Sequence, residues 1–292
     1  MKLHLQASSI RATLFTAALI AAPAMWANHP VLVEGNCNNP PFGDSTVRSA
    51  GNCGDFDGDN RIGVEEDNDG DRVFGTITAA NASRGAADNG IITIVTSGTF
   101  AEAVVLAGNV TLQAAPGVHA NIDAVLQGDS GSTPRQGVPG IVVNAPANRF
   151  VTIRNLTIRN WTSGIQVNGA SRVIIENCLI EHNTNYGVEV TGTAKVLVDG
   201  SKIVGTGLRV NPATGDFPTS AAPKPGNGIN FMGGSTGTVA NSTIVGSFGT
   251  GVANQTMNGR AVLIEGSTFF DNGEDWSRAQ IQPRGANNSA VN

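Results

Sequence analysis

A repeat between Gly140 and Asp275 constrains the fold of this chain more than any other feature of its sequence. Five segments begin with glycine and start 24, 23, 41 and 23 residues apart, at 140–163, 164–186, 187–227, 228–250 and 251–275. The third segment is one period plus about 18 extra residues. A fixed period in the twenties indicates a solenoid, in which each repeat adds one layer.

Each repeat contains two short strand-like runs separated by a turn. The first run has apolar residues two positions apart, as in Val151 and Ile153, which is strand spacing. Two residues after it comes a residue type that tolerates a left-handed turn: Asn155, Asn177, Gly200, Asn241 or Gly266. Three residues further on, an apolar residue returns the chain to the core: Ile158, Ile180, Ile203, Ile244 or Phe269. Strands and turns with no helix between them predict a parallel β-helix with one coil per repeat.

On these repeats the chain resembles the right-handed parallel β-helix, or pectin-lyase-like, superfamily over residues 73–275. The resemblance implies an all-β fold, a single right-handed parallel β-helix of about eight or nine coils. It does not imply one function, because the superfamily holds lyases, hydrolases, esterases, epimerases, phage spikes and binding proteins. The turn with Gly98, Phe100 and Glu102 is also similar to the opening coils of pectin methylesterases.

The two ends of the predicted β-helix differ in composition. The alanine-rich segment 76–87 predicts a short N-terminal capping helix. Such a helix would cover the open end of the solenoid, where an exposed strand edge invites aggregation. Residues 276–292 are polar and predict a loose C-terminal tail.

Residues 1–27 have the pattern of a secretory signal peptide. Two basic residues precede the apolar run 13–22, and small residues permit cleavage after Ala24 or Ala27. The run is too short to span a membrane, and no later segment is long enough. We therefore expect a secreted or periplasmic protein, with an uncleaved anchor as the alternative.

The three cysteines divide between two settings. Cys37 and Cys53 each lie in a Gly-Asn-Cys triplet within a region that has little apolar material. An exported compartment permits oxidation, so we predict a disulfide between them. Cys178 follows a turn residue where the other repeats carry Leu or Ser, and it is predicted to be a buried small residue.

We predict that residues 28–72 form an irregular, disulfide-pinned acidic segment. Residues 55–66 place carboxylates at positions 1, 3, 5 and 12 of a twelve-residue loop, which resembles an EF-hand calcium loop. Asn60 stands where that family usually has Gly, and it can adopt the same left-handed turn. The run 67–71 also resembles the aspartate-rich calcium repeats of extracellular proteins. The resemblance implies a structural calcium ion bound by Asp55, Asp57, Asp59, Arg61, Glu66, Asp67, Asp69 and Asp71, and the alternative is a solvated acidic linker.

Two polar segments, 127–139 and 206–226, leave the regular repeat. Long loops on a regular scaffold commonly carry function, and these two would wall a groove if they left the same side of the solenoid. The candidate substrate-binding residues are two aromatic residues that close successive coils and one arginine on each segment: Trp161, Tyr186, Arg135 and Arg209. Simple packing is the alternative for the aromatic pair.

Outward-facing positions of successive coils form ladders, and catalytic candidates are sought there. One ladder lies two residues after each repeat glycine: Val142, Gln166, Glu189, Asn230 and Ala253. The sharpest hypothesis is a cluster of carboxylates and basic groups: Glu181, His182, Glu189, Asp199 and Lys202. Paired acids could hydrolyse a glycosidic bond, and a basic residue with calcium could perform β-elimination on a uronate. The alternative is ordinary cross-strand pairing, because opposite charges occupy neighbouring rungs at Arg154 and Glu176.

The sequence favours one function and leaves a second open. The catalytic motifs of polygalacturonases, pectin methylesterases and pectate lyases are absent. The formal net charge of −5 provides no basic surface for nucleic acid. We expect an exported, monomeric β-helix protein that binds, or binds and processes, an extracellular or cell-envelope polysaccharide, with calcium stabilising its N-terminal segment. The alternative is a non-catalytic structural or adhesive protein of the cell surface.

Overall fold

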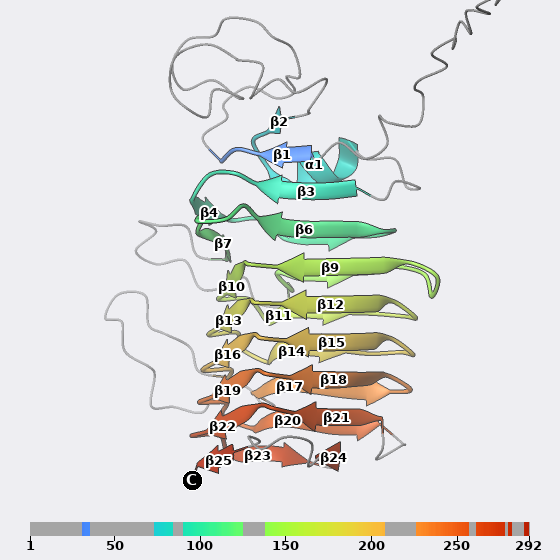
Figure 1. The fold of residues 1–292 in the computed structure, drawn as a ribbon, viewed down its shortest axis with the longest axis vertical. Coiled ribbons are helices and arrows are strands. Elements are labelled where there is room, and N and C mark those ends of the chain that lie inside the picture. The colour runs from blue at the N-terminus through green and yellow to red at the C-terminus, as the bar shows by residue number, and fades with distance from the viewer. Residues whose placement is uncertain are drawn as a thin grey trace, which may run out of the picture.

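The computed structural model of the chain describes residues 31–35, 73–83, 90–124, 138–207, 226–256, 261–277, 280–281 and 289–291. These residues form a parallel β-helix whose three sheets run along one axis (Figure 1). Neighbouring strands pair in parallel, as in β9 with β12 and β12 with β15. The predicted all-β solenoid is confirmed, and the three sheets agree with the expected eight or nine coils.

The first sheet, called sheet A, has ten strands in the order β2 (Val73–Phe74), β1 (Val31–Val33), β3 (Gly90–Ile94), β6 (Val110–Ala114), β9 (Phe150–Arg154), β12 (Arg172–Glu176), β15 (Lys195–Asp199), β18 (Thr236–Ala240), β21 (Val262–Glu265) and β24 (Gln280–Ile281). Sheet B has eight strands in the order β25 (Ser289–Val291), β22 (Thr268–Phe270), β19 (Thr243–Val245), β16 (Lys202–Val204), β13 (Leu179–Glu181), β10 (Thr157–Arg159), β7 (Ala120–Asp123) and β4 (Gly98–Phe100). Sheet C has seven strands in the order β23 (Glu274–Ser277), β20 (Thr250–Thr256), β17 (Asn227–Gly233), β14 (Tyr186–Val190), β11 (Ser163–Val167), β8 (Ile141–Val143) and β5 (Val104–Leu106).

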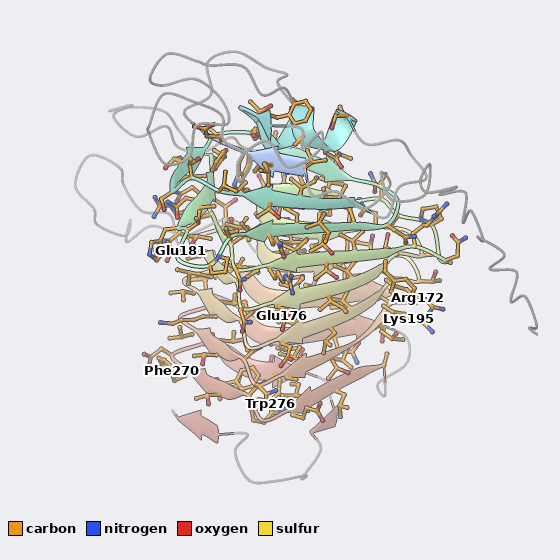
Figure 2. The ribbon with its side chains drawn as sticks, turned by 45° about the horizontal axis from the view of Figure 1, so that its top comes forward. Arg172, Glu176, Glu181, Lys195, Phe270 and Trp276 are labelled. Carbon is orange, nitrogen blue, oxygen red and sulfur yellow. The ribbon has the colours of Figure 1, made fainter. Side chains whose placement is uncertain are left out.

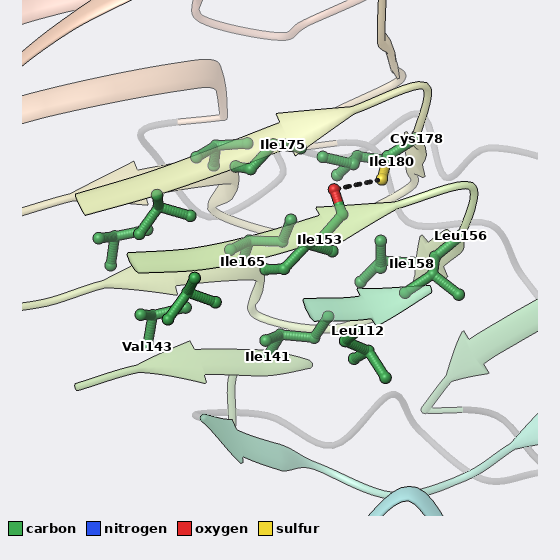
Figure 3. Close-up of a cluster of buried hydrophobic side chains, with 14 of the residues drawn as sticks. Leu112, Ile141, Val143, Ile153, Leu156, Ile158, Ile165, Ile175, Cys178 and Ile180 are labelled. Carbon is green, nitrogen blue, oxygen red and sulfur yellow. Dashed lines mark hydrogen bonds between the residues drawn. The ribbon is translucent and has the colours of Figure 1, made fainter. Parts of the chain in front are cut away.

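The core lies between the three sheets and contains the alternating apolar residues of the repeats. Ile153 and Ile175 on sheet A and Ile158 and Ile180 on sheet B are fully buried. Figure 3 shows these side chains stacked coil upon coil, with Cys178 beside them. Cys178 is buried as predicted, and burial raises the pKa of its thiol to about 12. The thiol is therefore a packing group and not a nucleophile at neutral pH.

The predicted left-handed turn between sheets A and B is present in all five repeats. The residues at this turn have positive φ angles of 57°, 50°, 57°, 48° and 58°. A second left-handed row, which the sequence analysis missed, follows five residues later at Asn160, His182, Gly205, Gly246 and Asp271. Its residue types, mostly Asn, Asp and Gly, were the available signal.

The repeat glycines mark the corner at which the chain enters sheet C. A Cβ on Gly187 would lie 2.5 Å from the carbonyl oxygen of Gly228 and 2.7 Å from Ile203 Cγ2. Gly164 and Gly228 have the same relation to the next glycine of the row. The repeat therefore begins with glycine because successive coils approach too closely here for a side chain.

The two ends of the solenoid depart from the expected boundaries. Helix α1 (Ile77–Ser83) is present as predicted and packs against β1, β2, β3 and β5. Its first two amides donate to the Glu102 carboxylate, from Ile77 at 2.7 Å and from Thr78 at 2.8 Å. However, β1 belongs to sheet A although residues 28–72 were predicted to be irregular, and β23, β24 and β25 extend the three sheets beyond residue 275. The sequence did not indicate these strands, because a strand of two to four residues is too short to give a periodic signal.

Candidate functional site

Both long segments leave the solenoid at one corner. Residues 125–137 connect β7 of sheet B to β8 of sheet C, and residues 208–225 connect β16 of sheet B to β17 of sheet C. The strands β11 and β14 lie between β8 and β17 in sheet C. The outer face of β11 and β14 is therefore flanked by the strands at which both segments rejoin the sheet, although the segments themselves lie outside the described residues.

A carboxylate occupies the centre of this face. Glu189 on β14 accepts hydrogen bonds at Oε2 from Ser163 Oγ at 2.9 Å and from Gln166 Nε2 at 3.1 Å, both on β11. Among the described residues, Oε1 of Glu189 accepts no hydrogen bond. One oxygen thus fixes the orientation of the carboxylate, and the other can accept a proton or a hydroxyl hydrogen bond from a ligand.

Two buried asparagines on β17 continue the polar row. Asn227 Nδ2 donates to Asn230 Oδ1 at 3.2 Å, and Asn227 Oδ1 accepts from the Thr250 amide at 2.9 Å. Asn230 is fully buried, yet its Nδ2 has no hydrogen-bond acceptor within the described structure. A buried amide without a partner is costly to folding and is a reason to look for a function.

Tyr186 begins β14 and lies in the same row as Ser163 and Asn227. Its side chain is partly exposed. Burial, and then the negative charge of Glu189, raise the pKa of the Tyr186 hydroxyl above its ordinary value. The phenol therefore remains protonated and can donate a hydrogen bond to a ligand on this face.

The strand register explains why these polar residues meet. Gln166 pairs with Glu189, and Glu189 pairs with Asn230, on successive rungs of sheet C. Their neighbours Val188 and Ile229 are fully buried in the core. The register of the ladder predicted two residues after each repeat glycine is thus confirmed, but Asn230 and Ala253 are buried and not outward-facing as expected. Ser163 and Asn227 are additional residues that the sequence analysis did not identify. Their position just before or at the repeat glycine was the signal for them.

The predicted catalytic cluster does not assemble. Glu181 and Lys202 lie on sheet B, Asp199 lies on sheet A, and only Glu189 lies on sheet C. The prediction was wrong because residues separated by about half a repeat face different sides of the solenoid. No second carboxylate therefore joins Glu189 within the described residues, and paired-acid hydrolysis has no support there.

Glu181 and His182 belong to a separate charged ladder on sheet B. Arg159 Nε donates to Asp123 Oδ2 at 2.6 Å, and its Nη1 lies 3.5 Å from Glu181 Oε1. Asn160 Nδ2 donates to Asp123 Oδ1 at 2.8 Å, so the buried Asp123 carboxylate has a partner at each oxygen. Burial lowers the pKa of His182, and the nearby Glu181 carboxylate opposes that shift. This ladder is explained by cross-strand pairing, which was the alternative in the sequence analysis.

Trp161 does not form a sugar-binding platform with Tyr186. Its ring is fully buried, and its Nε1 donates to the Ile122 carbonyl at 2.9 Å. The prediction was wrong because the indole fills the corner over Gly140, where a Cβ would lie 2.6 Å from Trp161 Cδ1. The other predicted binding residues, Arg135 and Arg209, lie outside the described residues, as do Cys37, Cys53 and the acidic segment 55–71.

Within the described part of the chain, no group of three or more His, Cys, Asp or Glu side chains is arranged to hold a metal ion. In the same residues, no helix has the length and apolarity needed to cross a membrane.

Comparison with known proteins identifies the family. The family model described as the right-handed beta helix region matches residues 139–290, which is more than half of the chain. The chain therefore belongs to the right-handed β-helix family. No curated protein matches the chain.

Solved structures with a similar course of the chain include two lyases. Alginate lyase from Paenibacillus sp. str. FPU-7 is 15% identical with a TM-score of 0.46, covering 68% of this chain and 74% of that chain. Pectate lyase Pel9A is 14% identical with a TM-score of 0.44, covering 88% of this chain and 72% of that chain. At these identities the likeness concerns the fold and carries nothing about activity.

Proposed function

We propose that this β-helix protein binds a polysaccharide on the outer face of sheet C, around Glu189. The supporting observation is the row of Gln166, Glu189 and Asn230, in which one carboxylate oxygen and one buried amide have no partner among the described residues. Carbohydrate hydroxyls both donate and accept hydrogen bonds, so they match a carboxylate beside an amide donor. Long segments that rejoin the sheet on either side of this row are where binding residues usually occur.

We further propose that Glu189 serves as a general base if the bound polymer is processed. A single oriented carboxylate can remove a proton, as elimination requires, whereas paired-acid hydrolysis needs two carboxylates at a defined separation. Tyr186 is the candidate proton donor, because it is protonated at neutral pH and lies on the same strand as Glu189.

The test measures binding and turnover on a panel of neutral and uronate polysaccharides, with calcium or with a chelator. Binding is followed by affinity electrophoresis, and turnover by new reducing ends and unsaturated products. We expect Glu189→Gln to weaken binding by roughly tenfold or more, because hydrogen bonds to charged groups contribute about 1.5–3 kcal/mol.

The matched control is Glu265→Gln, the same exchange on the outer face of sheet A. It should leave binding unchanged. Equal losses in both variants, or no binding to any polymer on the panel, would contradict a carbohydrate site at Glu189.

A non-catalytic structural or adhesive role is the second candidate. The observation in its favour is the sheet B ladder, where Arg159 is paired with Asp123 and Glu181 and no group is left for chemistry. Binding to a polymer without any turnover, in the wild type and with calcium present, would support this role over an enzymatic one.

Export and calcium binding remain part of the proposal. They are supported by the signal-peptide pattern of residues 1–27 and by the carboxylate spacing of residues 55–66. If calcium stabilises the N-terminal segment, a chelator should lower the melting temperature of the mature protein, and Asp55→Asn together with Asp57→Asn should remove that dependence. A melting temperature that ignores both calcium and chelator would contradict the calcium part of the proposal.

A further inference from the structure

The outer face of sheet A carries three columns of side chains that run across the coils. One edge has Phe150, Arg172 and Lys195 on successive rungs, and the opposite edge has Arg154, Glu176 and Asp199 on the same rungs. Between them lies a central column that includes Thr152, Ile174, Leu197, Thr238 and Leu263. Figure 2 shows Arg172 and Lys195 beside each other at one edge and Glu176 away from them.

Each charged column places like charges on neighbouring rungs. Arg172 pairs in register with Lys195, and Glu176 pairs with Asp199. Like charges directly opposite each other destabilise a sheet. Within the described residues, Lys195 and Glu176 have no ion-pair partner, and Arg172 is held by the ring of Phe150 at 5.3 Å. Asp199 Oδ1 accepts a hydrogen bond from Asn241 Nδ2 at 2.9 Å, but no ion pair among the described residues compensates either column.

The centre of the face is apolar and open. At the centre Ile174 is 36% exposed, and at the edge Phe150 is 53% exposed. A shallow hollow of about 470 Å³ lies over β12, β15 and β18 and is lined by Arg172, Ile174, Lys195, Leu197 and Thr238. Exposed apolar surface bordered by charges is typical of an interaction site.

A two-fold axis parallel to the solenoid axis would bring the basic edge of one copy against the acidic edge of a second copy. On β12, Arg172 and Glu176 lie two residues before and after Ile174, and on β15, Lys195 and Asp199 lie two residues before and after Leu197. A second copy rotated about that axis would place its Glu176 against Arg172 and its Asp199 against Lys195. Its Ile174 and Leu197 would meet the same residues of the first copy, and its Arg154 would face Phe150.

We propose that sheet A is the interface of a symmetric dimer, formed face to face with a second copy of this chain. The charge pattern fits a second copy because a two-fold interface must be complementary to itself, and each strand here carries opposite charges at equal distances from its apolar centre. The other two-fold orientation, perpendicular to the solenoid axis, would set cations against cations. The interface differs from the monomer expected from the sequence, and it leaves sheet C open in both copies.

The size of the face predicts a reversible dimer. Seven strands from β3 to β21 at about 4.8 Å spacing and about 17 Å length give roughly 500 Å² per copy. That is below the roughly 800 Å² per partner of a standard stable interface. We therefore expect a dimer that dissociates on dilution and that weakens in high salt, because its charged rims are partly exposed.

The test uses two oppositely charged variants of the mature protein and sedimentation equilibrium at several concentrations and salt levels. One variant has Arg172→Glu and Lys195→Glu, which makes both edges acidic. The other has Glu176→Lys and Asp199→Lys, which makes both edges basic. Each alone should dimerise at least about tenfold more weakly than wild type, and their mixture should form a heterodimer of wild-type affinity or better.

The matched control is Lys202→Glu on sheet B, which reverses a charge in the same coil but outside the proposed interface. It should dimerise like wild type. Circular dichroism of each variant establishes that it is folded. A monomeric wild type at all concentrations, or variants that fail to pair with each other when both are folded, would overturn the proposal. Neither result bears on the polysaccharide site, which lies on another sheet.

Discussion

The outer faces of sheets A and C are built from the same coils, yet their charged side chains have different neighbours. On sheet C, Glu189 is held from the neighbouring rung by Ser163 and Gln166. On sheet A, Arg172 and Lys195 lie on neighbouring rungs with the same charge. Sheet C thus orients its carboxylate by hydrogen bonds from the neighbouring rung, whereas Arg172 and Lys195 on sheet A have no ion-pair partner among the described residues.

This difference suggests what each face binds. A pre-oriented carboxylate beside an unpartnered amide presents a few defined hydrogen-bonding positions, which suits a flexible polar ligand. Two like-charged columns on either side of an apolar strip present an extended pattern, which suits another protein surface of reciprocal charge. In a β-helix the rung spacing is fixed, so the choice between these two outcomes depends on which residue types share a column.

The largest expected effect comes from the glycine corner that supports sheet C. Gly187→Ala should lower the free energy of unfolding by about 3 kcal/mol or more, because the new methyl group would overlap the Gly228 carbonyl and Ile203. Urea denaturation measures the loss. Gly98→Ala is the matched control, since no atom lies within 4 Å of a Cβ there. Similar stabilities for the two variants would show that the corner is less tightly packed than described.

An intermediate loss of unfolding free energy is expected for the two asparagines of sheet C, and a smaller one for a charged residue of sheet A. Asn227→Ala should cost about 1–3 kcal/mol of unfolding free energy, because the buried Thr250 amide loses its acceptor. Asn230→Ala should cost less, since it loses the 3.2 Å bond from Asn227 Nδ2 but also removes the unpartnered Nδ2, and it should weaken polysaccharide binding. Lys195→Ala should change monomer stability by less than about 0.5 kcal/mol. Urea denaturation and affinity electrophoresis together check this order, and a large stability loss in Asn230→Ala would place that residue in folding instead of binding.

The smallest effect concerns sheet B, which provides a reference for the other two faces. The pKa of His182 is lowered in the folded protein, so the unfolded chain binds a proton first as the pH falls below about 6.5. Stability should therefore decrease from that pH down to the folded pKa, and His182→Asn should remove this decrease. Asn suits the position because it accepts the φ of 55° found there. Melting temperatures between pH 7 and pH 5 measure the effect, and identical pH profiles for the variant and the wild type would contradict it.

The coil pattern could be predicted from the sequence because each coil repeats the same local requirements. Asn155, Asn177 and Asn241 all have the left-handed conformation expected of them, and the apolar rows are buried as predicted. The site was only partly predictable. Glu189 was identified, but Asn227 was not, although its position directly before the repeat glycine Gly228 was an available signal. Trp161 was assigned to the surface because the sequence does not show on which side of a corner a large ring will fit.

The sequence by itself determined the period, the turn positions and the register, and hence which residues share a ladder. These properties follow from short-range rules of strand alternation and of left-handed turns. Only the tertiary structure decided which of the three sheets each ladder belongs to, because that depends on the bend angles accumulated between strands. It separated Glu181, Glu189 and Asp199 onto three faces and brought the ends of the two long segments to one corner. The same folding placed Arg172 and Lys195 on a face where nothing described within the chain neutralises them.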